Sequence, residues 1–236
     1  MGVDALARLR EDPGRAAILL DIDGTLAPIV ARPEDAAVPD ETREVLRGLV
    51  DRYRLVGAVS GRPGADALDL ISVPGVQVVG NHGLELAEEA NAWRGRLRAF
   101  RNGVSWPVED KGLALSYHYR LHPDHDAARA ELELVAERAR VEGFRSRFGR
   151  MVLEVLPPLD VNKGTAVRAL LARAGLARAL FAGDDTTDLD AFGAIDELEV
   201  GVKVAVDSAE APPALRAGAD VVVPGTVGLV ELLRTL

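Results

Sequence analysis

Leu19-Leu-Asp-Ile-Asp-Gly-Thr-Leu26 is the stretch of sequence that decides the fold of this chain. The apolar run Ala16–Leu20 ends in it, and two carboxylates, Asp21 and Asp23, follow directly. A short run that is apolar on both faces is typical of a buried parallel strand. The carboxyl ends of such strands face the crevice where open α/β sheets bind ligands. Asp21 is therefore a candidate for chemistry.

Five further short runs repeat this strand-like pattern. They are Leu55–Val59, Val76–Val79, Ala179–Ala182, Glu199–Val204 and Asp220–Val223. Helical patterns lie between several of them, as in Glu41–Val50, Lys163–Ala174 and the terminal Val227–Leu236. Alternating strands and helices predict an α/β fold with a doubly wound, Rossmann-like parallel sheet.

Residues 85–158 do not show this alternation of strands and helices. Leu113–Arg120 alternates like a strand, with two tyrosines and a leucine on one face. Pro123–Glu142 predicts a long helix, and Phe144–Val155 predicts a hairpin around Phe148-Gly149-Arg150. We expect residues 85–158 to form a smaller α+β domain. It would be inserted into a larger one made of residues 1–84 and 159–236.

The composition excludes several classes of protein. A formal net charge of −9 argues against a nucleic-acid partner, because a protein needs a surface rich in Lys and Arg to bind a phosphate backbone. The chain has no cysteine, so disulfides and thiolate catalysis are excluded. No stretch approaches the ~20 apolar residues of a membrane helix. We expect a cytoplasmic monomer without a membrane partner.

Four separated polar groups suit phosphate transfer. Asp21 can attack phosphorus as a nucleophile, and Asp23 can protonate the leaving oxygen and later deprotonate water. Ser60 ends the second apolar run, where its hydroxyl can hold phosphate oxygens that are not transferred. Lys163 opens a helix and can neutralise charge that develops on the phosphoryl group.

The segment Gly183-Asp-Asp-Thr-Thr-Asp188 crowds acids after a third apolar run. Such crowding is repulsive unless a hard dication such as Mg²⁺ offsets it. The metal would be bound by Asp21, the Asp23 carbonyl and Asp184. Around these ligands, without contacting the metal, would lie Asp185 and Asp188. The alternative is that these acids cap the helix that follows.

The order of these segments resembles the haloacid dehalogenase superfamily. Its motifs run Asp-x-Asp-Gly-Thr, then Ser or Thr, then Lys, then Gly-Asp-Asp-x-x-Asp, and this chain has all four. The resemblance implies a core of that superfamily's fold and a Mg²⁺-dependent hydrolase.

Further segments resemble trehalose-6-phosphate phosphatases more narrowly. They are Gly80-Asn-His-Gly-Leu-Glu85, Val108-Glu-Asp-Lys111, Ser116-Tyr-His-Tyr-Arg120 and Leu153-Glu-Val155. The resemblance implies hydrolysis of trehalose 6-phosphate to trehalose and phosphate through an aspartyl-phosphate, as a step of trehalose biosynthesis. It also implies that residues 1–84 and 159–236 form the catalytic core, and that residues 85–158 form a cap domain that carries substrate specificity and binds the distal glucose. Charged side chains suit the vicinal hydroxyls of a sugar. The substrate-binding candidates are Glu109, Lys111, Glu154, His118 and Arg120 in the cap, and Arg62, Asn81 and His82 on core loops.

Two other functions stay open from the sequence. A phosphatase of the same superfamily could act on another glycosyl phosphate, such as mannosyl-3-phosphoglycerate or sucrose 6-phosphate. The acids Glu109 and Glu154 argue against the phosphoglycerate, which carries a carboxylate of its own. A non-catalytic sugar-phosphate sensor would be expected to lose Asp21 or Asp23, and both are present.

Overall fold

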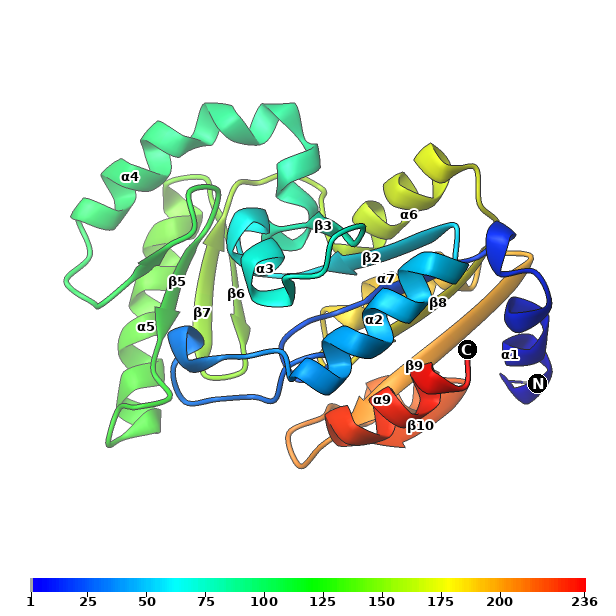
Figure 1. The fold of residues 1–236 in the computed structure, drawn as a ribbon. Coiled ribbons are helices and arrows are strands. Elements are labelled where there is room, and N and C mark those ends of the chain that lie inside the picture. The colour runs from blue at the N-terminus through cyan, green and yellow to red at the C-terminus, as the bar shows by residue number, and fades with distance from the viewer. Residues whose placement is uncertain (1) are drawn as a thin grey trace. The chain divides into compact units, whose positions relative to one another are not determined.

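The computed structural model of the chain describes residues 2–236. The chain divides into two compact units (Figure 1). The first unit comprises the residues up to Gly83 together with Val161–Leu236, and the second comprises Leu84–Asp160. In the part of the chain that the structure describes, no helix has the length and apolar character needed to cross a membrane.

A sheet of six parallel strands forms the centre of the first unit, in the order β10-β9-β8-β1-β2-β3. The strands are β1 (Ala17–Leu20), β2 (Leu55–Val59), β3 (Gln77–Val79), β8 (Arg178–Gly183), β9 (Val200–Asp207) and β10 (Val221–Pro224). This topology confirms the predicted doubly wound fold. The strand order reverses between β1 and β8, which is where such sheets bind ligands beyond the carboxyl ends of their strands. Asp21 follows β1 and Asp184 follows β8.

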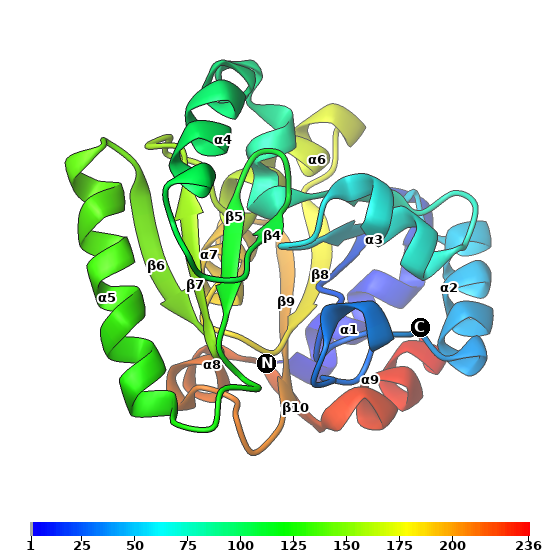
Figure 2. The ribbon, with the colours of Figure 1, turned by 90° about the vertical axis from the view of Figure 1, so that its left-hand side faces the viewer.

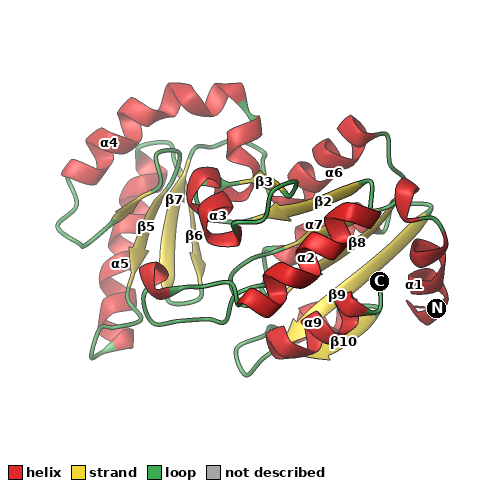
Figure 3. Ribbon diagram, in the orientation of Figure 1, coloured by secondary structure: helices red, strands yellow, loops and turns green. Residues whose placement is uncertain are grey.

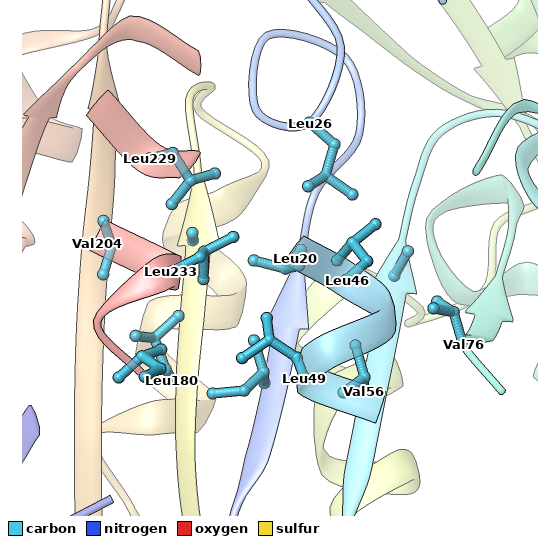
Figure 4. Packing of buried hydrophobic residues seen from close by; sticks show 14 of the residues in the cluster. Leu20, Leu26, Leu46, Leu49, Val56, Val76, Leu180, Val204, Leu229 and Leu233 are labelled. Carbon is cyan, nitrogen blue, oxygen red and sulfur yellow. The ribbon is translucent and has the colours of Figure 1, made fainter. Parts of the chain in front are cut away.

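Helices cover both faces of this sheet. They are α1 (Gly2–Glu11), α2 (Asp40–Arg52), α3 (Gly64–Ile71), α6 (Lys163–Ala174), α7 (Asp188–Ile195), α8 (Pro213–Gly218) and α9 (Gly225–Arg234), with short 3-10 turns at Pro13–Arg15 and Pro33–Asp35. Figure 4 shows leucines of α2 and α9 packed over β1, β2, β8 and β9. On the opposite face, Phe181 of β8 meets Phe192 of α7 edge to face, and their ring centroids lie 6.3 Å apart.

The second unit is an antiparallel sheet with helices on one face. Its strands, in the order β4-β5-β7-β6, are β4 (Glu109–Asp110), β5 (Leu115–His118), β7 (Val152–Leu156) and β6 (Arg145–Gly149). Its helices are α4 (Arg94–Asn102) and α5 (His125–Val141), preceded by 3-10 segments at Asn81–Leu86, which begins in the first unit, and Glu88–Trp93. Figure 2 shows α5 running alongside β6, and Figure 3 separates helices from strands by colour.

Alternation along β5 and β7 divides the two faces of this sheet. Leu115, Tyr117, Leu153 and Val155 are fully buried in one cluster with residues of α4 and α5. Burial raises the pKa of Tyr117 to about 12, as expected for a phenol inside a core. Tyr119 belongs to the same cluster, which confirms the predicted face. The side chains between these positions lie on the other face.

The helix and the hairpin predicted for this unit are both present, with shifted boundaries. The helix expected from Pro123 begins at His125, because the side chain of Asp124 accepts a hydrogen bond from the Ala127 N–H at 3.0 Å and caps the helix. The hairpin has Met151 at its turn with φ 55°. Trp93 and Trp106 are partly buried and pack against the cluster of the second unit.

Leu180→Ala tests the packing of the larger sheet. Leu180 has 0% exposure under α9, so truncation should lower the free energy of unfolding by about 2–5 kcal/mol. Leu134→Ala is the matched control, because Leu134 is 74% exposed on α5 and should change stability by less than about 0.5 kcal/mol. Urea unfolding of both variants checks this, and equal losses would contradict the assignment of Leu180 to the core.

Candidate functional site

A buried lysine joins two of the predicted acids in the first unit. The Nζ of Lys163 lies 2.8 Å from Oδ1 of Asp21 and 2.7 Å from Oδ1 of Asp188. Asp21 is held at the end of β1, where its N–H donates to the carbonyl of Ala182 at 2.9 Å. All three charged side chains are buried. The structure therefore brings together residues that the sequence places far apart.

Local hydrogen bonds set the position of Lys163. Asn162 caps α6: its side chain accepts from the Thr165 N–H at 2.9 Å, and the Thr165 hydroxyl accepts from the Asn162 N–H at 3.0 Å. This reciprocal pair begins the helix at Lys163. Gly164 lies so close to α7 that a Cβ there would stand 2.3 Å from the carbonyl oxygen of Asp190.

Asp188 organises the acidic loop rather than capping the helix after it. Its Oδ2 accepts hydrogen bonds from the N–H groups of Asp184 and Asp185, both at 2.9 Å. Thr187 is the N-cap residue of α7 and makes no side-chain capping bond. The alternative that these acids only cap a helix is therefore wrong for Asp188. Asp185 accepts locally, from the N–H of Thr186 at 2.7 Å.

The electrostatics of this cluster show an excess of buried negative charge. Burial raises the pKa of Asp21 well above its usual range, against the opposing attraction of Lys163. Burial alone would lower the pKa of Lys163, but the attraction of Asp188 and Asp21 outweighs it and raises that pKa. Both shifts mean that the cluster retains protons strongly. A site with this property also favours an added cation.

The residues present fit a divalent metal. Single oxygens of Asp21, Asp184 and Asp188 lie within 4.8 Å of one another. Three carboxylates opposed by the single ammonium of Lys163 leave two negative charges, which one dication would offset. Both oxygens of Asp188 already accept hydrogen bonds, so Asp21 and Asp184 are the carboxylates best able to bind a metal. Oxygen donors of this kind suit Mg²⁺.

Two glycines allow the acids to approach so closely. A Cβ on Gly24 would stand 1.9 Å from Oδ2 of Asp184, and one on Gly183 would stand 2.2 Å from Cγ of Asp188. Gly24 also has φ +84°, a conformation that L side chains rarely adopt. Any larger residue at either position would displace a carboxylate of the cluster.

Arg62 forms a bidentate ion pair with Asp23. Its Nε donates to Oδ2 of Asp23 at 2.8 Å and its Nη2 donates to Oδ1 at 2.7 Å. Nη2 also donates to the carbonyl of Pro33 at 3.1 Å. The sequence marked both residues but did not predict this pairing, which orients the Asp23 carboxylate.

Ser60, Asn81 and His82 belong to two loops that are tied together. The Ser60 hydroxyl is buried and accepts from the N–H of Arg62 at 3.2 Å. The N–H groups of Asn81 and His82 donate to the carbonyls of Arg62 and Ser60, both at 2.8 Å. The ring of His82 covers Gly61, where a Cβ would stand 2.4 Å from Nε2. Asn81 and His82 have φ near +50°, a strained backbone for these residues.

The predicted sugar-binding residues gather on the polar face of the second unit. Lys111 Nζ lies 3.9 Å from Oε2 of Glu109 and 3.6 Å from Oε1 of Glu154. His118 Nε2 lies 2.7 Å from Oε2 of Glu109, which places His118 on the same face. Arg120 lies in the turn after β5, where its carbonyl meets the His125 ring at 3.1 Å.

Arg147 of β6 is a charged residue of this face that the sequence reasoning missed. It lies directly opposite Glu154 in the sheet and forms an ion pair with it. No motif contains Arg147. The predicted turn at Phe148-Gly149-Arg150 implies another register, so the sequence carried no signal for the pairing of Arg147 with Glu154.

Comparisons with known proteins agree with this architecture. The sequence matches the profile of the trehalose-phosphatase family over residues 19–106 and 102–214. It is 36% identical over 220 residues to a probable trehalose-phosphate phosphatase of Sinorhizobium fredii, covering 84% of this chain and 80% of the relative. It is 32% identical to a trehalose-phosphate phosphatase of Mycobacterium ulcerans, covering 85% of this chain and 58% of the relative.

Other relatives are much longer than this chain. A protein of Mycobacterium tuberculosis described as an uncharacterized glycosyl hydrolase is 34% identical, and the match covers 80% of this chain but 16% of that protein.

Solved structures share the fold. The C-terminal domain of a C. albicans trehalose-6-phosphate phosphatase has a TM-score of 0.79 at 21% identity, covering 100% of this chain and 96% of the other. A trehalose-6-phosphate phosphatase related protein has a TM-score of 0.74 at 25% identity, covering 93% and 96%. With the family profile matched over most of its length and relatives above 30% identity, this chain belongs to the trehalose-phosphatase family.

Proposed function

We propose that this protein is a Mg²⁺-dependent phosphatase that hydrolyses trehalose 6-phosphate to trehalose and phosphate. The observation that carries the proposal is the buried cluster of Asp21, Lys163, Asp184 and Asp188 at the reversal of the strand order. Family membership supports the substrate, since relatives that carry the name trehalose-phosphate phosphatase align over most of this chain.

In the proposed mechanism, Asp21 attacks phosphorus and forms an aspartyl-phosphate. Asp23 protonates the departing sugar oxygen and then takes a proton from the water that hydrolyses the intermediate. Arg62 orients Asp23 through its ion pair. Lys163 lies within hydrogen-bonding distance of Asp21 and would offset charge on the phosphoryl oxygens, while Ser60 would hold oxygens that are not transferred.

Asp21, Asp184 and the Asp23 carbonyl would hold Mg²⁺, which supplies Lewis-acid neutralisation of the phosphoryl oxygens when bound. Asp188 keeps the loop of Asp184 and Asp185 in place through its two backbone contacts. We assign no ligand role to Asp185, whose carboxylate accepts from its own loop.

The second unit would recognise the sugar. Glu109, Lys111 and Glu154 offer both donors and acceptors on one face, which suits the vicinal hydroxyls of a glucose ring. His118 and Arg120 are further candidates, with Asn81 and His82 on the loops of the first unit. We also propose that the protein acts in the cytoplasm as a monomer on a small sugar phosphate. Its formal charge of −9 supports the absence of a nucleic-acid partner.

Asp21→Asn tests the nucleophile. The amide cannot attack phosphorus, so phosphate release should fall by about 10³-fold or more. The protein should still fold, because Lys163 keeps its ion pair with Asp188 when Asp21 loses its charge. Asp126→Asn, at an exposed position of α5, is the control and should retain full turnover. Near wild-type phosphate release by Asp21→Asn would refute the assignment.

Metal removal tests the acidic cluster. EDTA should abolish phosphate release, Mg²⁺ should restore it, and Ca²⁺ should inhibit because its larger, looser coordination positions the nucleophile badly.

Mg²⁺ should also raise the melting temperature of the wild type but not that of Asp184→Asn, since a ligand that binds only the folded state stabilises it. The apparent Mg²⁺ affinity should weaken as the pH falls, because the raised pKa of Asp21 makes protons compete with the metal. Full activity in a verified metal-free sample would contradict the proposal.

The cap variants Glu109→Ala, Lys111→Ala and Glu154→Ala test sugar recognition. Each should lose about 1–3 kcal/mol of transition-state binding for trehalose 6-phosphate, because a hydrogen bond to a charged group is removed. Hydrolysis of p-nitrophenyl phosphate should change much less, since that ester contains no sugar for these residues to bind. The test is to measure kcat and KM of each variant with trehalose 6-phosphate and with p-nitrophenyl phosphate. Equal losses on both would assign these residues to chemistry or folding, and unchanged kinetics on both would remove the support for recognition.

A further inference from the structure

One histidine and four charged side chains form an array on the polar face of the second unit's sheet. In the order of their contacts they are His118, Glu109, Lys111, Glu154 and Arg147. The strand register explains the alignment. Glu109 pairs with Ser116, Ser116 with Glu154, and Glu154 with Arg147, so these four positions form one row across the sheet.

The contacts of the array are uneven. Arg147 Nε donates to Oε2 of Glu154 at 2.8 Å, and Nη2 lies 2.7 Å from the same oxygen. The other oxygen, Oε1, faces Lys111 at the longer distance of 3.6 Å. The Glu154 side chain is 8% exposed and that of Arg147 is 31% exposed. Arg147 therefore holds one oxygen of a nearly buried carboxylate with two nitrogens, at distances shorter than the 3.6 Å contact between Lys111 and the other oxygen.

We infer that Arg147 is a positioning residue for recognition of the sugar. It fixes the Glu154 carboxylate through Oε2, and this sets the direction in which Oε1 accepts hydrogen bonds, including one from a sugar hydroxyl beside the Lys111 ammonium. A carboxylate that is already held in its binding conformation loses little entropy when the ligand arrives. The inference rests on the proposed role of Glu154 in binding the sugar.

The competing explanation is that Arg147 only protects a sheet edge. β6 is an edge strand, and charged residues on edges discourage pairing with other chains. That role requires a charge but no particular partner, and Arg145 already provides one on the same strand. The ion pair with Glu154 is specific to a guanidinium that reaches one oxygen with two nitrogens. The two explanations therefore differ in their expectation for Arg147→Lys. Edge protection would be fully retained by lysine, whereas positioning of Glu154 would be retained only in part.

The test compares Arg147→Met and Arg147→Lys with the control Arg140→Met, which removes an exposed arginine of α5. With trehalose 6-phosphate, Arg147→Met should raise KM by about tenfold, the loss expected when a charge-assisted contact becomes poorly oriented. kcat should change by less than about twofold, because Arg147 does not touch the reacting atoms. Arg147→Lys should recover part of the loss. Hydrolysis of p-nitrophenyl phosphate should be unchanged, and the melting temperature of Arg147→Met should fall only slightly, because Lys111 remains beside Glu154.

A double-mutant cycle with Glu154→Gln separates this inference from the proposed function. If Arg147 acts through Glu154, adding Arg147→Met to Glu154→Gln should raise KM little further. If Glu154→Gln itself leaves KM for trehalose 6-phosphate unchanged, the proposed sugar contact fails. If Glu154→Gln raises KM but Arg147→Met does not, the positioning inference alone is overturned. Equal losses on both substrates with a lowered melting temperature would also overturn it, in favour of a structural role.

Discussion

The ion pairs of Lys163 are the interaction on which the rest of the first unit depends. One ammonium joins the acid after β1 to the acid that opens α7, and each contact is shorter than 3 Å. Burying these charges is costly unless each is paired in good geometry. Asp188 meets that condition by accepting two backbone N–H groups besides Lys163. The pairing therefore links a strand end, a helix start and a loop that are distant in sequence.

The parallel sheet makes this convergence possible. β1 and β8 are direct neighbours in register, so the loops that follow them leave the same edge of the sheet. The reversal of strand order at this point leaves room above the strand ends. Backbone constraints act in the same direction, because Gly24 and Gly183 give the carboxylates of Asp184 and Asp188 space that a side chain would occupy. The resulting excess of negative charge is what suits the cluster to a dication.

The second unit uses its sheet differently. One face is apolar and buries Tyr117 and Leu153 against α4 and α5. The other presents charged groups in one cross-strand row. Because side chains alternate along a strand, a single register decides both the core and the charged array. A slip of one residue would bury Glu154 among the aromatic residues, so the packed core also holds the array in place.

The sequence by itself determined the fold class, the central strands and most of the chemistry-bearing residues, because apolar runs that end in acids are local patterns. It did not predict α3 or α4, because helices of 8 and 9 residues give the helical apolar period few repeats. The pairing of Arg62 with Asp23, the three donors on Asp188 and the clamp of Arg147 on Glu154 were decided only by the tertiary structure. These contacts depend on which strands become neighbours and in what register, and no local pattern encodes that.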